Sequence, residues 1–160
     1  MGANHSFFMN PGLLALGIAT NAFEEVRASA LGYSKNSRDI TKYQSTRFNF
    51  AEMENQIQAA YALATSIINR IGASDEVKPE EFLRVKLIAS ETAVDIASKA
   101  LRMAGGRGFH CDWPFERHLR EAFSSVAMGP ANEIIKEKLA NALFDQPFVV
   151  DKTKQLLVNQ

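Results

Sequence analysis

The stretch from Arg102 to Arg107 combines residue types that suit the binding of an anion. Gly105 and Gly106 lie between the two arginines, and glycine lets a backbone approach a ligand closely. Each guanidinium group can donate two parallel hydrogen bonds to a phosphate or pyrophosphate. Backbone N–H groups at the start of the next helix would add to this attraction. The same residues also suit a tight turn between helices with solvated or paired charges, so the motif alone leaves both interpretations open.

Further arginines follow the glycine cluster on the next expected helix. Arg117 and Arg120 are three residues apart, which places them on one helix face. Glu116 and Glu121 are close enough in sequence to neutralise part of this charge. We therefore expect anion binding mainly from Arg102 and Arg107, beside backbone N–H groups.

A second group of chemically active residues surrounds the only cysteine, Cys111. His110, Asp112 and His118 complete a conceivable set of metal ligands, but Pro114 and the glycine cluster place them on different elements. We therefore predict no metal site. A single cysteine excludes an internal disulfide and a zinc site with several cysteines, and it fits a reducing compartment such as the cytoplasm.

The composition narrows the class of protein. The chain has 160 residues, of which 46% are apolar, and 18 basic residues balance 18 acidic ones. This apolar content excludes disorder over most of the chain, and the zero net charge argues against binding nucleic acid by bulk charge. The most apolar early stretch, Leu13 to Ala22, is too short to span a membrane.

Hydrophobic periodicity and helix-terminating residues predict an all-α fold. Long helices joined by short loops indicate an up-down antiparallel bundle over residues 1–144, followed by a C-terminal tail, 145–160, without a clear period. Many small residues at close positions favour self-association. The expected helices run from Pro11 to Ser34, from after Asp39 to Ile71, from Pro79 to Ala104, from Pro114 to Met128 and from Pro130 to Phe144.

Apolar residues recur along one face of each long helix. Gly72 stands where a left-handed C-terminal cap belongs. The face expected for the first helix comprises Leu14, Ile18, Ala22, Val26 and Ala30, and that of the second Phe50, Met53, Ile57, Tyr61, Ala64, Ile68 and Ile71.

Several short motifs, in order, resemble the C-terminal domain of the acyl-CoA dehydrogenase family. The resemblance covers residues 7–144 and includes the family's Gly-Gly-x-Gly-Tyr/Phe, x-Pro-x-Glu-Arg and Arg-Asp-Ala elements. The matching segments are Gly105–Phe109, Trp113–Arg117 and Arg120–Ala122, with Val85–Glu91 upstream and Gly129–Ile134 downstream.

This resemblance implies a helical domain of a flavoprotein that removes hydrogens from the α and β carbons of acyl thioesters. It also implies FAD as cofactor and a homodimer or tetramer. Alone, the chain lacks the β-domain wall of the flavin site. The resemblance therefore leaves three alternatives open: an excised domain, a split-gene subunit whose partner chain carries the N-terminal and β domains, or a reduced relative. In the family the glycine loop meets the flavin pyrophosphate of the neighbouring subunit. By this resemblance the cofactor-binding residues are Arg38, Arg102, Gly105, Gly106, Arg107 and Asn132.

The chain departs from the family where catalysis would take place. The family's catalytic glutamate precedes the Gly-Thr motif, but Ala127 and Met128 precede Gly129 here; the alternative family position falls near Phe7. Proton abstraction needs a carboxylate, so we assign no catalytic residue and expect the chain alone to be inactive. Two functions remain open: part of a flavin-dependent oxidoreductase active on acyl thioesters in fatty acid metabolism, or a non-catalytic assembly module of the same fold.

Overall fold

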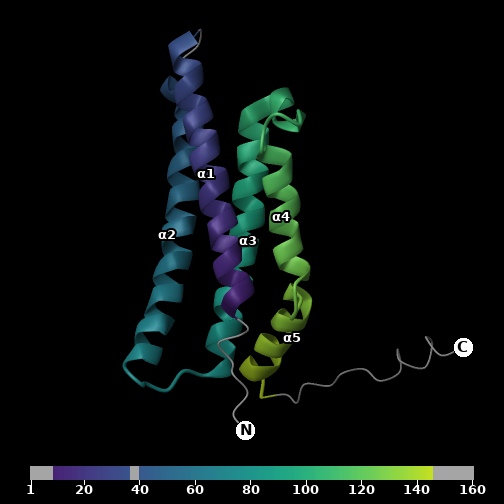
Figure 1. Ribbon diagram of the computed structural model, residues 1–160. Coiled ribbons are helices and arrows are strands. Elements are labelled where there is room, and N and C mark those ends of the chain that lie inside the picture. Colours follow the sequence, from purple (N-terminus) through teal and green to yellow (C-terminus); the bar gives the residue numbers. More distant parts are fainter. Residues whose placement is uncertain (1–8, 37–39, 146–160) are drawn as a thin grey trace, which may run out of the picture.

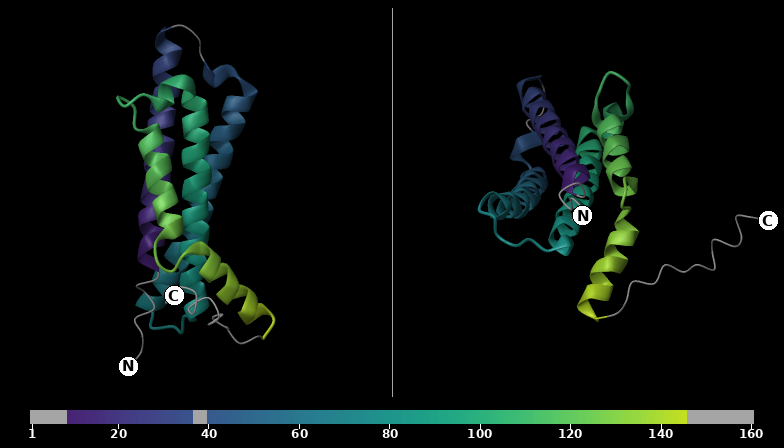
Figure 2. Two further views of the ribbon diagram at one scale, coloured as in Figure 1. Left: turned by 90° about the vertical axis from the view of Figure 1, so that its right-hand side faces the viewer. Right: turned by 60° about the horizontal axis from the view of Figure 1, so that its bottom comes forward.

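The computed structural model describes residues 9–36 and 40–145 and confirms an all-α, up-down antiparallel bundle (Figure 1). Helices α1, α2, α3 and α4 alternate in direction, and the short α5 leaves the lower end of α4 at an angle (Figure 2). In the described ranges no helix has the length and apolar character needed to cross a bilayer. The elements are α1 (Asn10–Asn36), the 3₁₀ turn η2 (Ile40–Lys42), α2 (Gln44–Gly72), α3 (Pro79–Ala104), the 3₁₀ turn η3 (Gly105–Phe109), α4 (Phe115–Ala127) and α5 (Asn132–Leu143).

Helix α3 has the predicted boundaries because local chemistry defines both of its ends. Pro79 occupies the first turn, and the Glu81 carboxylate accepts a 2.8 Å hydrogen bond from the Lys78 N–H. The Arg70 guanidinium pairs with the same carboxylate and lowers its pKa, chiefly through their hydrogen bond.

The predicted C-terminal cap of α2 at Gly72 is wrong. Helix α2 includes Gly72, and the positive φ, 61°, falls on Ser74.

Helix α3 lies in the middle of the bundle and contacts α1, α2, α4 and α5 (Figure 2). Many of its inward-facing side chains are small, so its neighbours can approach closely. The buried residues of α3 are Phe82, Leu83, Val85, Lys86, Ala89, Ser90, Ala93, Ile96, Ala97, Ala100 and Leu101.

The predicted core faces of α1 and α2 are only partly correct. Leu14 is 53% exposed, and Leu16 takes its place in the core. A strict repeat of four advances about 40° past each full turn, so five members spread over about 160° of the helix. Leu14, at one end of the series, therefore leaves the core, whereas Ala30 at the other end stays buried. On α2, the predicted core residues Tyr61, Ile68 and Ile71 are likewise exposed.

Helices α1 and α3 approach each other closely at Gly12. A Cβ atom there would lie 2.8 Å from the Cα of Lys86 and 3.3 Å from the carbonyl oxygen of Val85. Both are backbone atoms, which cannot move aside without shifting a helix. Gly17, also on α1, has nothing within 4 Å of a built Cβ.

We predict opposite effects of alanine at these two glycines. Gly12→Ala will lower the free energy of unfolding, because overpacking costs about 1–3 kcal/mol and the better helix propensity returns about 1 kcal/mol or less. Gly17→Ala will raise it by about 0.5–1 kcal/mol. Thermal and urea unfolding followed by circular dichroism will measure both. Equal stabilisation by the two substitutions would contradict the close contact.

Candidate functional site

The glycine loop, η3, closes the upper end of the bundle. Gly105 has a φ of 65°, a conformation that L side chains rarely adopt, and it ends α3. At Gly108 a Cβ atom would lie 2.7 Å from the Leu101 side chain, so glycine lets the loop fold back on α3. Gly106 differs from both, because its φ is not positive and a Cβ there would meet nothing within 4 Å. The fold of this chain therefore does not require glycine at 106.

Four of the six predicted cofactor-binding residues lie together at this end. Arg102 and Arg107 are exposed beside Gly105 and Gly106. Arg102 also acts on the Asp95 carboxylate, where burial opposes the hydrogen bonds and positive charges that lower its pKa. The exposed guanidinium and backbone groups form a positively charged edge that an anion can reach from solvent.

The remaining arginines of this region are neutralised as expected. Arg117 lies 3.6 Å from the Glu121 carboxylate, and Arg120 lies 3.5 Å from Glu116, both along α4. These exposed pairs contribute little to stability. Neither of these α4 carboxylates pairs with Arg102, which is exposed beside the glycine loop.

A small cavity adjoins the loop and was not apparent from the sequence. Its volume is about 160 Å³, and a narrower cleft beside it is lined by Arg107, Trp113 and Phe115. The Trp113 ring stacks on the buried Phe115 ring with centroids 6.1 Å apart. A sequence motif could not reveal the cavity, because its lining residues come from three separate segments of the chain. Its lining residues are Val26, Ser29, Ala30, Ile40, Met103 and Ala104.

Asn132, the fifth predicted cofactor residue, lies far from the loop. It is buried, and its Oδ1 accepts hydrogen bonds from Lys86 Nζ at 2.6 Å and Ser90 Oγ at 3.1 Å. Lys86 precedes Gly105 by most of α3, a distance of about 28 Å along the helix axis. Asn132 therefore holds α5 against α3 in this chain. Arg38, the sixth, lies outside the described residues.

Lys86 is the buried polar residue that the sequence interpretation missed. Its side chain is completely buried, and its Nζ also donates to the Val126 carbonyl at 3.3 Å. Burial lowers the pKa of the Lys86 ammonium, and the negative charge of Glu133 opposes that shift. The sequence signal that could have revealed this buried group is the presence of a lysine on the apolar side of α3. By binding Val126 and Asn132, Lys86 anchors both ends of the α4–α5 connector.

That connector carries Met128 at the position of the family's catalytic glutamate. Met128 is the C-terminal cap of α4, with 40% of its surface exposed. A thioether cannot abstract a proton. The alternative position near Phe7 lies outside the described residues.

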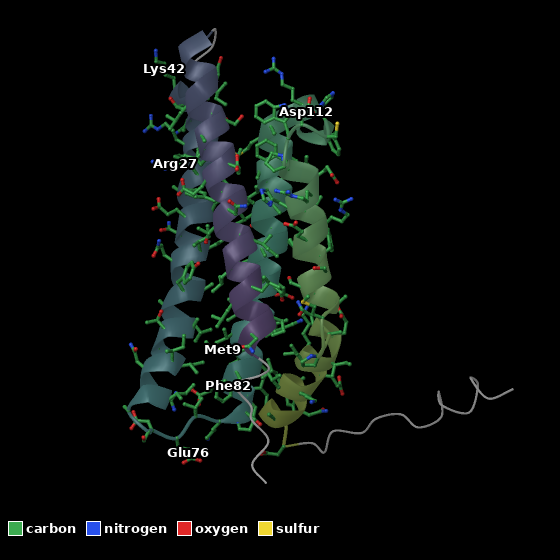
Figure 3. All side chains as sticks on the ribbon, viewed as in Figure 1. Met9, Arg27, Lys42, Glu76, Phe82 and Asp112 are labelled. Atoms are coloured by element: carbon green, nitrogen blue, oxygen red, sulfur yellow. The ribbon has the colours of Figure 1, made fainter. Side chains whose placement is uncertain are left out.

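The four residues considered as metal ligands separate into two places. His118 is buried on α4, with neither ring nitrogen hydrogen-bonded. His110, Cys111 and Asp112 are exposed and lie together in the turn before α4. Figure 3 shows Asp112 at the same end of the bundle as Lys42 of η2, opposite Glu76 and Phe82.

We predict strong coupling between Lys86 and Asn132. Asn132→Leu removes the main acceptor of a buried amine and will cost about 1.5–3 kcal/mol. The double variant Lys86→Met with Asn132→Leu will recover part of this loss, because apolar groups then replace both partners. Urea unfolding of the single and double variants measures the coupling. Asn55→Leu, at an exposed position of α2, is the control, and strictly additive losses would refute the interaction.

Comparison with known proteins agrees with the fold. The family described as "Acyl-CoA dehydrogenase, C-terminal domain" matches residues 9–144. A 3-sulfinopropanoyl-CoA desulfinase of Variovorax paradoxus is 31% identical over 89% of this chain and 35% of its own length. A short-chain specific acyl-CoA dehydrogenase of Clostridium acetobutylicum is 30% identical over 81% of this chain and 34% of its own.

The solved structure of butyryl-CoA dehydrogenase from Megasphaera elsdenii matches with a TM-score of 0.75 and 28% identity, over 86% of this chain and 36% of that one. The chain thus spans about a third of the length of the relatives it matches. By its sequence and by its helical bundle, the chain belongs to the acyl-CoA dehydrogenase family, as a match to the C-terminal domain.

Proposed function

We propose that this chain is the C-terminal domain or a subunit of an FAD-dependent oxidoreductase that acts on acyl thioesters. The observation that carries the proposal is Gly106, a glycine that the fold does not require, exposed beside Arg102 and Arg107. A side chain there would hinder the close approach of a ligand to the backbone. The names of the relatives support the substrate class, since each acts on an acyl-CoA.

The residues of the loop fit the pyrophosphate of FAD. Arg102 and Arg107 would hold its negative charge by charge-assisted hydrogen bonds, and Gly105 and Gly106 would let the backbone approach it. When bound, the flavin supplies the acceptor for hydrogen removed from the acyl group. The chain's own contribution is to hold the anionic end of the cofactor. Asn132 has no part in this contact, because its side-chain oxygen is already bonded and buried.

The complete site requires further polypeptide. We propose that the N-terminal and β domains, on a partner chain, supply the remaining wall of the flavin pocket, and that the bundle self-associates so that the loop faces a neighbouring site. Exposed apolar side chains on the outer surface, among them Leu14, Ile68 and Phe109, support such association. A cytoplasmic location agrees with the single cysteine.

A second candidate function rests on Met128. An assembly module needs the bundle and its contacts but no general base, and the connector presents none at that position. A bound flavin distinguishes the two functions, because only the oxidoreductase component requires it.

The loop predicts a specific loss of affinity for the cofactor. Arg107→Ala will weaken binding of FAD or ADP about ten-fold or more, since a hydrogen bond to a charged group contributes roughly 1.5–3 kcal/mol. Fluorescence or calorimetric titration measures the affinity after light scattering has established the oligomeric state.

Arg84→Ala, at an exposed position near the other end of α3, is the matched control and will not change the affinity. Circular dichroism will show that both variants remain folded. Equal affinities in the wild type and Arg107→Ala would show that the loop only connects two helices.

The chain by itself will not dehydrogenate acyl thioesters. A missing general base lowers rates by about 10²–10⁴-fold, and the β-domain wall is needed besides. The pure chain with FAD, short- and medium-chain acyl-CoA and an artificial electron acceptor provides the assay. A full-length acyl-CoA dehydrogenase serves as the positive control, and measurable turnover by the chain would refute the prediction.

A further inference from the structure

The turn between η3 and α4 brings three different ligand types together. His110, Cys111 and Asp112 each offer one donor atom, and these atoms all lie within 4.8 Å of one another. His110 Nδ1 is 3.2 Å from Asp112 Oδ2, and Cys111 Sγ is 3.9 Å from Asp112 Oδ1. The cluster therefore forms without any contribution from distant parts of the chain.

These separations are close to those around a tetrahedral zinc ion. Zn–N and Zn–O bonds of about 2.1 Å place neighbouring nitrogen and oxygen ligands about 3.4 Å apart, and a Zn–S bond of about 2.3 Å places sulfur and oxygen about 3.6 Å apart. The two observed distances differ from these values by a few tenths of an ångström and end on different oxygens of Asp112, Oδ2 for His110 and Oδ1 for Cys111. Small side-chain rotations would bring the three donors onto one ion.

The backbone of this turn is held in place from both sides. The His110 N–H donates to the Arg107 carbonyl at 3.0 Å, and the Trp113 N–H donates to the His110 carbonyl at 2.9 Å. Trp113 stacks on Phe115, which is buried in the bundle. The donors thus project from an anchored turn, which reduces the conformational entropy lost when an ion binds.

The charge and exposure of the cluster also suit a cation. A thiolate and a carboxylate together balance a divalent ion, and a neutral imidazole completes three ligands. All three residues are exposed, so a hydrated ion can reach them and water can occupy a fourth position. The sequence predicted no metal site, but the structure brings three of the four candidate ligands into one turn. We propose that His110, Cys111 and Asp112 bind a divalent transition-metal ion of the zinc class. None of these three ligands belongs to the proposed flavin contact, which lies next to them in the chain.

The single cysteine makes the test unambiguous. Protein without an affinity tag is titrated with Co²⁺, whose thiolate charge-transfer absorption can arise only from Cys111. Zn²⁺ is then expected to displace Co²⁺ and to slow alkylation of Cys111 at least ten-fold, and EDTA is expected to restore the original rate.

Matched variants test each ligand. Cys111→Ser will abolish the charge-transfer band, and His110→Ala or Asp112→Asn will weaken Co²⁺ and Zn²⁺ at least ten-fold, since even residues that only orient ligands cost 10–100-fold. His5→Ala and Asp75→Asn, which alter the same residue types elsewhere, will leave the affinity unchanged. Absence of the charge-transfer band together with an unchanged alkylation rate at millimolar Zn²⁺ would overturn the site. Equal affinity in Asp112→Asn would overturn the proposed ligand set.

Discussion

Packing of four other helices against α3 is the interaction that organises the rest of the structure. The helices α1, α2, α4 and α5 all contact it, so its side chains must satisfy several neighbours at once. Small residues such as Ala93 and Ala97 meet this demand, because they let helix backbones approach without leaving cavities. Gly12 shows the limit of this closeness, since even one added carbon would meet the backbone of α3.

The same packing buries one charged side chain, Lys86, inside the core. Lys86 is enclosed by its neighbours and must find acceptors among them, which it does in Asn132 and the Val126 carbonyl. Taking an amine out of water is costly unless it is hydrogen-bonded. The two hydrogen bonds that offset this cost also hold the α4–α5 connector, which carries Met128. The buried amine of Lys86 therefore helps to fix the position of the connector that carries Met128.

The two ends of the bundle consequently have different properties. At the upper end the chain leaves α3 through the exposed loop of Gly105 and Gly106, beside charged residues and a small cavity. At the lower end the connector is fixed by buried hydrogen bonds and presents no carboxylate at position 128. The upper end carries features suited to holding an anion, whereas position 128 at the lower end carries a thioether. This contrast agrees with a domain that supports a site completed by other polypeptide.

The sequence by itself determined the helical class, both ends of α3 and the grouping of Arg102 with the glycine loop. These features depend on neighbouring residues, whose backbone preferences act over a few positions. Helix packing determines that Leu14 faces solvent, that Lys86 is buried, and that Asn132 bonds to Lys86, a residue about 28 Å along α3 from the loop. The face that a helix buries depends on its neighbours, and a hydrogen bond between residues 46 positions apart exists only once the helices have packed.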